Sequence, residues 1–277
     1  MEAGHRIQST PRKGTRQVTL VPSPEVNAPL LNATLRQIGV VRSAIANRKD
    51  LPPLGAPASV ELFPEFADGL LHFEKHSHLW VMAWLDTAAR DPLQVIPRGL
   101  KDQGEAGLHG VFAVRSPARP NPIGLTAARV VGRSGLRIDF DALDFNDGTP
   151  VIDLKPYFAS RDMIFSAHSD QVGRPTDANA IRESAHMQAL AFAGRESDGL
   201  DLAVAIMTHF RTEVLGYTDP ETWDVTVPLG RPRLSEALTG LTRTWPQFHS
   251  VDAVIFRYGA FTYEYELHED DFRFYPH

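Results

Sequence analysis

The stretch GVFAVRSPARPNPIGLT, residues 110–126, places three prolines, two arginines and an asparagine between two apolar runs. Proline fixes the backbone angle φ and removes an amide donor, so a central strand does not carry such a cluster. The stretch therefore predicts a strand, then a rigid cationic loop, then a second strand. We call residues 115–122 the elbow.

Short apolar runs of strand length lie on both sides of the elbow, and RSG and NDG turns separate the later ones. In this half of the chain only residues 67–76 are typical of a short helix. Many strands with few helices between them indicate an antiparallel barrel or sandwich. The expected strands cover residues 38–43, 58–63, 78–85, 110–116, 125–132, 136–143 and 149–157.

The pattern becomes helical after about residue 177, which predicts a small α+β domain at the carboxyl end of the chain. We divide the chain into an N-terminal extension (1–34), a barrel (35–165), a linker (166–180) and this domain (181–277). Gly216 is the expected cap of the second helix, and Gly259 and Ala260 the turn of a hairpin. The expected helices cover residues 177–193, 201–216 and 232–245, and the expected strands 223–229, 251–258 and 261–268.

Composition excludes several classes of protein. The chain of 277 residues is 43% hydrophobic and has no cysteine, so it has neither disulfides nor a thiol nucleophile. No apolar run is long enough to span a membrane, and the first residues lack the apolar core of a signal peptide, which favours the cytoplasm. Residues 196–277 carry 6 basic and 14 acidic side chains. A polyanion would therefore bind to the first part of the chain.

The elbow carries side chains suited to binding a polar ligand. The guanidinium groups of Arg115 and Arg119 suit a carboxylate or a phosphate. Asn121 offers an amide donor and an acceptor for a base or an amine. The alternative is a structural loop whose arginines only close a turn.

A second dense segment, LDFNDGTPVIDLKPY, covers residues 143–157 and contains three aspartates, Asp144, Asp147 and Asp153. A carboxylate can hold a ribose diol or an amino group, and Gly148 permits close approach to the backbone. The alternative is a β-turn in which Asp147 binds the turn's own backbone.

Other kinds of catalytic site have little support. Ser77 and Ser116 stand in no G-x-S-x-G elbow, and His72, His76 and His78 are not followed by H-E-x-x-H. Neither the Rossmann nor the P-loop glycine pattern occurs. We therefore expect no metal site and no dinucleotide fold.

The two dense segments together closely resemble the TsaA-like (TrmO) family, whose patterns are GVFATRSxxRPNPIG and LDxxDGTPVxDIKPY. The upstream segments IGVVRS and ELFPEFADGLLHFEKHSHLWVMAWL resemble the same family, in the same order along residues 36–162. The resemblance implies a single-sheet β-barrel that binds S-adenosylmethionine. It also implies a homodimeric methyltransferase that acts on N6 of threonylcarbamoyl-adenosine at position 37 of tRNA, beside the anticodon.

The resemblance also assigns residues to the cofactor site. The family's contacts fall on the elbow, on the start of the strand that follows it, on the end of the strand at 78–85 and on the turn at 144–149. A first-loop position is included, although the family's Pro-Arg-Gln is absent here. The cofactor-binding residues implied are Pro52, Leu85, Asp86, Arg115, Arg119, Leu125, Asp144, Gly148 and Thr149.

Two residues are our hypotheses for the methyl-transfer step. The lone pair of an N6 nitrogen is delocalised, so the nitrogen needs an acceptor for its proton to become nucleophilic. Asn121 is the expected acceptor, because the neighbouring prolines would hold its amide still. Asp147 is the expected base.

Three departures from the family pattern leave other functions open. The first loop reads Asp50-Leu51-Pro52-Pro53 without Arg-Gln, Leu85-Asp86 replaces the usual His-Gln, and the family's DPRPAY-like segment has only residues 230–233, GRPR, in its place. The alternatives are a related methyltransferase acting on a small molecule or a protein, and a non-catalytic S-adenosylmethionine-binding module.

Overall fold

The computed structural model describes residues 34–52, 54–165, 167, 177–217 and 223–277. The proposed extension at 1–34 and most of the proposed linker lie outside the described residues. The proposed domain boundaries therefore stay predictions.

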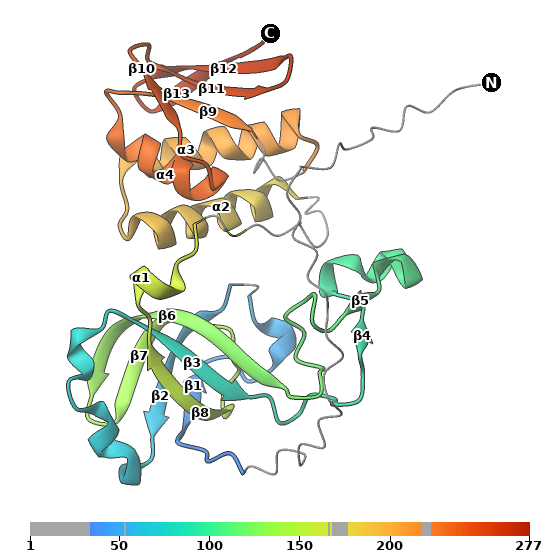
Figure 1. Ribbon diagram of the computed structural model, residues 1–277, viewed down its shortest axis with the longest axis vertical. Coiled ribbons are helices and arrows are strands. Elements are labelled where there is room, and N and C mark those ends of the chain that lie inside the picture. Colours follow the sequence, from blue (N-terminus) through green and yellow to red (C-terminus); the bar gives the residue numbers. More distant parts are fainter. Residues whose placement is uncertain (1–33, 53, 166, 168–176, 218–222) are drawn as a thin grey trace, which may run out of the picture. The chain divides into compact units, whose positions relative to one another are not determined.

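Six strands in the first half form a closed barrel in which every neighbouring pair is antiparallel (Figure 1). Their order around the barrel is β1-β2-β7-β6-β3-β8. The expectation of a mainly β protein with a single-sheet antiparallel barrel is confirmed. The bounds are β1 (Gly39–Ser43), β2 (Ala56–Leu62), β3 (His78–Trp84), β6 (Ile123–Ser134), β7 (Arg137–Leu143) and β8 (Pro150–Pro156).

The barrel is filled by alternate side chains of its strands. In β3, Leu79, Val81 and Ala83 are buried, while the residues between them are half-buried. This two-residue period is the pattern by which these runs were predicted as strands. Further fully buried members of this core include Val41, Val60, Ile138, Phe140, Leu143 and Val151.

Connections between the barrel strands contain short 3₁₀ helices and one small ribbon. The predicted helix at 67–76 is wrong, because the chain instead forms two 3₁₀ turns separated by His72, whose φ of 62° is left-handed. A left-handed residue cannot continue a right-handed helix. These elements are η1 (Arg48–Asp50), η2 (Pro64–Leu70), η3 (Phe73–Lys75), β4 (Gln94–Val95), η4 (Arg98–Gly107), β5 (His109–Gly110) and the single turn α1 (Ala159–Asp162).

The second half is an α+β unit, as expected, with a five-stranded sheet in the order β10-β9-β11-β12-β13. Its helices are α2 (Ala178–Ala193), α3 (Asp198–His209) and α4 (Pro232–Thr242), and a π-helical turn, η5 (Phe210–Val214), follows α3. The predicted helix at 201–216 therefore starts earlier than expected and ends in this turn. The strands are β9 (Asp224–Pro228), β10 (Gln247–His249), β11 (Ala253–Tyr258), β12 (Phe261–His268) and β13 (Asp271–Pro276).

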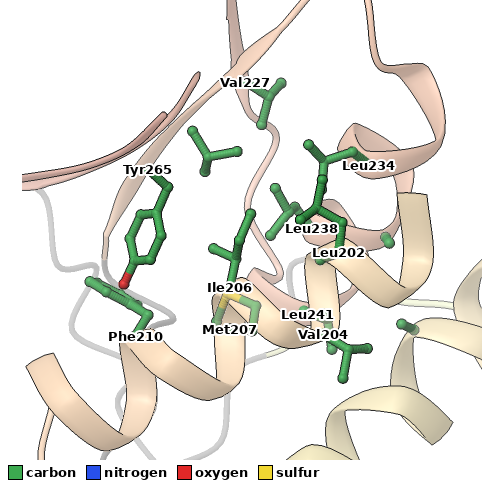
Figure 2. Close-up of a cluster of buried hydrophobic side chains, with 14 of the residues drawn as sticks. Leu202, Val204, Ile206, Met207, Phe210, Val227, Leu234, Leu238, Leu241 and Tyr265 are labelled. Atoms are coloured by element: carbon green, nitrogen blue, oxygen red, sulfur yellow. The ribbon is translucent and has the colours of Figure 1, made fainter. Parts of the chain in front are cut away.

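The core of the α+β unit lies between its helices and one face of its sheet. Figure 2 shows Tyr265 and Val227 from the sheet facing Ile206 and Leu238 from α3 and α4. The helix α2 joins this core through small residues, among them Ala185 and Ala189. The hairpin of β11 and β12 is confirmed, with Tyr258 paired to Phe261 across the predicted turn.

Candidate functional site

The elbow is folded around the side chain of Arg119. Its Nε donates to the carbonyl of Ser116 at 2.8 Å, and its Nη2 donates to the carbonyls of Val111 and Val114. All three carbonyls point toward the same guanidinium, so the chain before Arg119 forms a compact loop around this side chain. The strand expected at 110–116 is therefore wrong beyond Gly110, where β5 ends and turns begin.

The elbow is joined to the end of β3. The amide of Leu85 donates to the carbonyl of Pro122 at 2.8 Å, and the amide of Arg119 donates to the carbonyl of Ala89 at 3.1 Å. Where the elbow enters β6, Ile123 pairs with Trp84. The structure therefore brings Leu85 and the exposed Asp86 beside the elbow, which the resemblance implied.

The segment that follows β7 meets the start of β6. The hydroxyl of Thr126 donates to Oδ1 of Asp144, and the ring of Phe145 covers the α-carbon of Gly124. The start of β6 and the segment after β7 are therefore in direct contact on the barrel. Thr126 and Phe145 were missed by the sequence reasoning, although both lie inside the quoted segments.

The turn at 146–149 packs against the end of β1. The amide of Ser43 donates to Oδ1 of Asp147 at 3.0 Å, and the amide of Gly148 donates to the carbonyl of Val41 at 2.9 Å. Gly148 has a φ of 78°, and Thr149 is buried, with its hydroxyl donating to the carbonyl of Asn146 at 2.8 Å. One oxygen of Asp147 therefore has a structural role. The alternative interpretation of this turn also gave Asp147 a backbone partner, but the amide that it binds is that of Ser43 in β1 and not one of the turn itself.

Asp147 also lines a cavity of about 460 Å³ bounded by residues of β1, β2, β6 and β7. Arg42 and Asp139 line it too, and each is tied to another strand residue, Arg42 to Glu61 at 2.7 Å and Asp139 to Ser59 at 2.7 Å. Neighbouring guanidinium and hydroxyl groups hold the pKa of Asp139 below its ordinary value. Among the described residues no hydrogen bond or ion pair joins the lining of this cavity to Asn121.

The loop between β1 and β2 packs onto Asp144. The α-carbon of Gly55 lies against the carbonyl of Leu143 and the amide of Asp144, and the amide of Gly55 donates to the carbonyl of Pro52 at 3.0 Å. Pro52 itself is exposed. The same loop carries Arg48, which the sequence reasoning missed although it precedes the position where the family has Pro-Arg-Gln.

Several predicted site residues present exposed side chains on these connections. Arg115 and Asn121 are exposed on the elbow, as are Leu125 at the start of β6 and Asp144 after β7. Among the described residues Arg115 has no ion-pair partner. The guanidinium of Arg119, by contrast, is occupied by the loop's own backbone.

The arginines at 230–233 are engaged within the α+β unit. Arg231 makes a bidentate ion pair with Asp252 at 2.8 Å, and this pairing raises the pKa of Arg231. Arg233 pairs with Glu236 at 3.1 Å. These contacts give the segment a structural role of its own.

The histidine cluster around β3 contributes no recognisable centre. Ser77 and His78 are sequence neighbours whose side chains lie 2.9 Å apart, and both belong to the outer surface. In the described part of the chain no group of three His, Asp or Glu side chains is placed to hold a metal ion. None of the helices described there is long and apolar enough to cross a bilayer.

A family model described as "tRNA-methyltransferase O N-terminal domain" matches residues 40–163, the barrel and its connections. A "Probable S-adenosyl-L-methionine-binding protein" of Methanothermobacter thermautotrophicus is 40% identical over 134 residues, which cover 47% of this chain and 93% of that protein. One of the same description from Archaeoglobus fulgidus is 45% identical over 137 residues, 48% of this chain, but this match spans only 36% of that protein.

The "tRNA (adenine(37)-N6)-methyltransferase" of Escherichia coli K12 is 33% identical over 132 residues, which cover 44% of this chain and 56% of that enzyme. All these matches cover about half of this chain, and the family model coincides with the barrel and the segments that form the site. The resemblance noted in the sequence is confirmed, and the chain belongs to the TsaA-like (TrmO) family.

Proposed function

We propose that this chain transfers the methyl group of S-adenosylmethionine to N6 of threonylcarbamoyl-adenosine at position 37 of tRNA. The observation that carries the proposal is the meeting of the elbow segment with the Asp144 segment, through Thr126–Asp144 and Gly124–Phe145. Family membership supports the reaction class, and the name of the Escherichia coli relative supports the acceptor.

The groups exposed at this place fit S-adenosylmethionine, which supplies a methyl group activated by its sulfonium when it is bound. The free guanidinium of Arg115 can bind a carboxylate with two parallel hydrogen bonds. The second oxygen of Asp144 can accept from an amino group or a ribose diol, since only Oδ1 is bound by Thr126. Leu85 directly follows β3 and Leu125 lies in β6 opposite Met82, so both can offer apolar contacts to the cofactor.

The remaining predicted cofactor residues have supporting positions in the proposed site. Arg119 holds the elbow in shape, and Gly148 and Thr149 hold the turn after Asp144 against β1. Pro52 and Asp86 are exposed on the two connections beside the site. We assign these residues to the site as proposals on the strength of their places along the chain.

Catalysis here consists mainly of positioning an acceptor nitrogen and relieving it of its proton. Asn121 is exposed, and its own backbone is held by flanking prolines and by the amide of Ile123, which donates to the carbonyl of Asn121 at 2.7 Å. Its side-chain oxygen can therefore accept a hydrogen bond from the N6–H group, which orients the nitrogen and raises its nucleophilicity. Asp147 retains one unbound carboxylate oxygen and is the candidate base that takes the proton as the methyl group is transferred.

We further propose that the enzyme is a cytoplasmic homodimer, in line with the family it belongs to. Light scattering on the purified chain measures the oligomeric state. A mass near twice the 30.7 kDa of one chain is the expected result.

The direct test is methyl transfer from radiolabelled cofactor to total tRNA from a strain that lacks this modification. Mass spectrometry of the digested nucleosides should show the methylated threonylcarbamoyl-adenosine. In parallel, calorimetric titration with S-adenosylmethionine measures whether the chain binds the cofactor. Transfer only to small molecules or protein would replace the tRNA assignment by a related methyltransferase.

A non-catalytic S-adenosylmethionine-binding module is the second candidate function. The specific observation in its favour is that the Methanothermobacter and Archaeoglobus relatives are described as binding proteins, without a reaction. Tight binding of the cofactor, with no methyl transfer to any cell fraction, is the result that would select this candidate.

A further inference from the structure

Two arginines from different connections come together beside Asp144. Arg48 lies in η1, after β1, and Arg98 begins η4, between β4 and β5. The Nη2 group of Arg98 donates to the backbone carbonyl of Arg48 at 3.3 Å. The loop that carries Arg48 packs on Asp144 through Gly55.

Arg48, Arg98 and Asp144 together carry a net positive charge. The negative charge of Asp144 acts on Arg48, and one of its oxygens already accepts from Thr126. Among the described residues neither Arg48 nor Arg98 forms an ion pair. Both side chains are exposed, so a ligand can reach them.

The pKa of Arg48 reflects this crowding. It lies below the ordinary value, first because the guanidinium is partly desolvated and then because the positive charge of Arg98 is near; Asp144 acts in the opposite direction. Two like charges held together in a partly desolvated place repel each other, and an anion between them removes the repulsion.

The paired arginines elsewhere on the barrel make the contrast clear. Arg42, Arg129 and Arg137 lie on strands, and each has a carboxylate partner within 3.3 Å. The arginines of the connections around the elbow lack such partners in the described structure. These three strand arginines are therefore neutralised, whereas Arg48, Arg98 and Arg115 beside the proposed site have no carboxylate partner in the described part of the chain.

We propose that Arg48 and Arg98 form a phosphate-binding pair for the nucleic-acid acceptor, next to the cofactor site. A phosphodiester offers two unesterified oxygens and one negative charge, which match two guanidinium forks and the net charge of the group with Asp144. The proposed function assigns the cofactor's single carboxylate to Arg115. This inference rests on the proposed function, since it names how that site holds its acceptor.

The test is binding of a fluorescent anticodon stem-loop RNA to the full chain, saturated with S-adenosylhomocysteine to prevent turnover. The dissociation constant is measured by anisotropy over a series of salt concentrations for the wild type, Arg48→Gln and Arg98→Gln. Each lost phosphate contact should reduce the slope of log affinity against log salt by about 0.7 to 1.

Arg133→Gln is the matched control. Its guanidinium donates to the carbonyl of Gly135 near the end of β6 that is far from the elbow along the strand. Its salt slope should equal that of the wild type. An equal loss of slope in Arg133→Gln and in Arg48→Gln would overturn the assignment, because it would show a diffuse effect of net charge.

Calorimetry with S-adenosylmethionine separates the two sources of an anion. The cofactor's dissociation constant should stay within about threefold of the wild type in Arg48→Gln and Arg98→Gln, since a threefold change is under 1 kcal/mol. A loss of cofactor affinity with an unchanged RNA salt slope would identify the anion as the cofactor's carboxylate and overturn the proposal.

Titration with inorganic phosphate, followed through the arginine Nε resonances, distinguishes failure of this inference from failure of the proposed function. Joint shifts of Arg48 and Arg98, in a chain that methylates no tRNA, would support the phosphate pair and refute the proposed function. Methyl transfer to tRNA by the wild type, with unchanged salt slopes in both variants, would support the function and refute the pair.

Discussion

The ring of Phe145 lies on the α-carbon of Gly124 and leaves no room for a side chain there. A Cβ at position 124 would overlap Cε1 of Phe145, and would lie 3.1 Å from its Cζ and 3.3 Å from Cδ2 of Leu85. Glycine at this position therefore lets the start of β6, the segment after β7 and the residue after β3 pack closely together.

Gly124→Ala should displace Phe145 and destabilise the barrel by about 1 to 3 kcal/mol, which is the usual cost of overpacking. Urea denaturation measures this loss, and calorimetry should show weaker binding of S-adenosylmethionine. Gly110→Ala is the control, because a Cβ at Gly110 meets nothing within 4 Å and its φ is not positive. Equal stability of the two variants would contradict the proposed packing.

Arg119→Ala should lower stability because it leaves the backbone carbonyls of Val111, Val114 and Ser116 without their donor. A hydrogen bond to a charged group contributes about 1.5 to 3 kcal/mol, so a loss within or above this range is expected in thermal or urea unfolding. Arg119→Lys should recover only part of it, since an ammonium group cannot reproduce the planar fork. Wild-type stability in Arg119→Ala would show that the prolines alone hold the elbow.

Arg115→Ala should have the opposite profile. Its side chain is exposed and unpaired among the described residues, so stability should change by less than about 0.5 kcal/mol. Loss of a charge-assisted contact should weaken S-adenosylmethionine binding by about tenfold or more, measured by calorimetry. Unchanged cofactor affinity would remove Arg115 from the cofactor site.

Asn121→Ala and Asp147→Asn test the two groups proposed to act on the N6–H group, Asn121 as hydrogen-bond acceptor and Asp147 as base. Loss of a group that takes part in proton transfer reduces kcat by about 10² to 10⁴, while cofactor affinity should not change. Asp147→Asn keeps an oxygen for the amide of Ser43, so it removes the base and leaves the turn's hydrogen bond in place. Single-turnover methyl transfer to tRNA measures both variants, and a wild-type rate in either variant would remove that residue from its proposed role.

The stability of the α+β unit should rise with pH through the range just below 6.5. Burial lowers the pKa of His209 from its ordinary 6.5, against the opposing charge of Glu213. Its Nδ1 lies 3.0 Å from the hydroxyl of Tyr265, whose own pKa is raised by burial. The folded state then binds fewer protons than the unfolded state, so this contribution is complete above 6.5 and is lost as the pH falls towards the folded pKa.

Urea denaturation over a series of pH values checks this dependence. His209→Gln should flatten the pH profile, while His268→Gln, a change at an exposed position, should leave the profile as it is. The same slope in His209→Gln as in the wild type would assign the pH dependence to another group.

The alternation of apolar and polar residues was enough to predict most barrel strands, because the residues that point into the barrel must be apolar to form its core. Residues 110–116 could not be predicted in the same way. Their apolar residues fit a strand. The guanidinium of Arg119, several residues later, instead donates to the carbonyls of Val111 and Val114, which in a strand would accept from a neighbouring strand. Such a contact depends on three-dimensional geometry that no short-range period encodes.

The candidate site was predicted in its segments and less well in its contacts. The resemblance located the elbow, Leu85 and Asp144, and the structure joins them. The resemblance gave no indication of Arg98, which lies in a long connection without a recognised sequence motif. Arg119 was expected to face a ligand, and its guanidinium instead binds the loop that carries it.

Closure of the barrel has a consequence for how this enzyme family can diversify. Every strand has two hydrogen-bonded neighbours, so an inserted or deleted residue inside a strand would shift the register of both seams at once. Tolerated changes in length should accumulate between the strands, where Asp50–Pro53 and Leu85–Asp86 already depart from the family pattern. New substrates can therefore be acquired by exchanging loops on a scaffold whose strand lengths stay fixed.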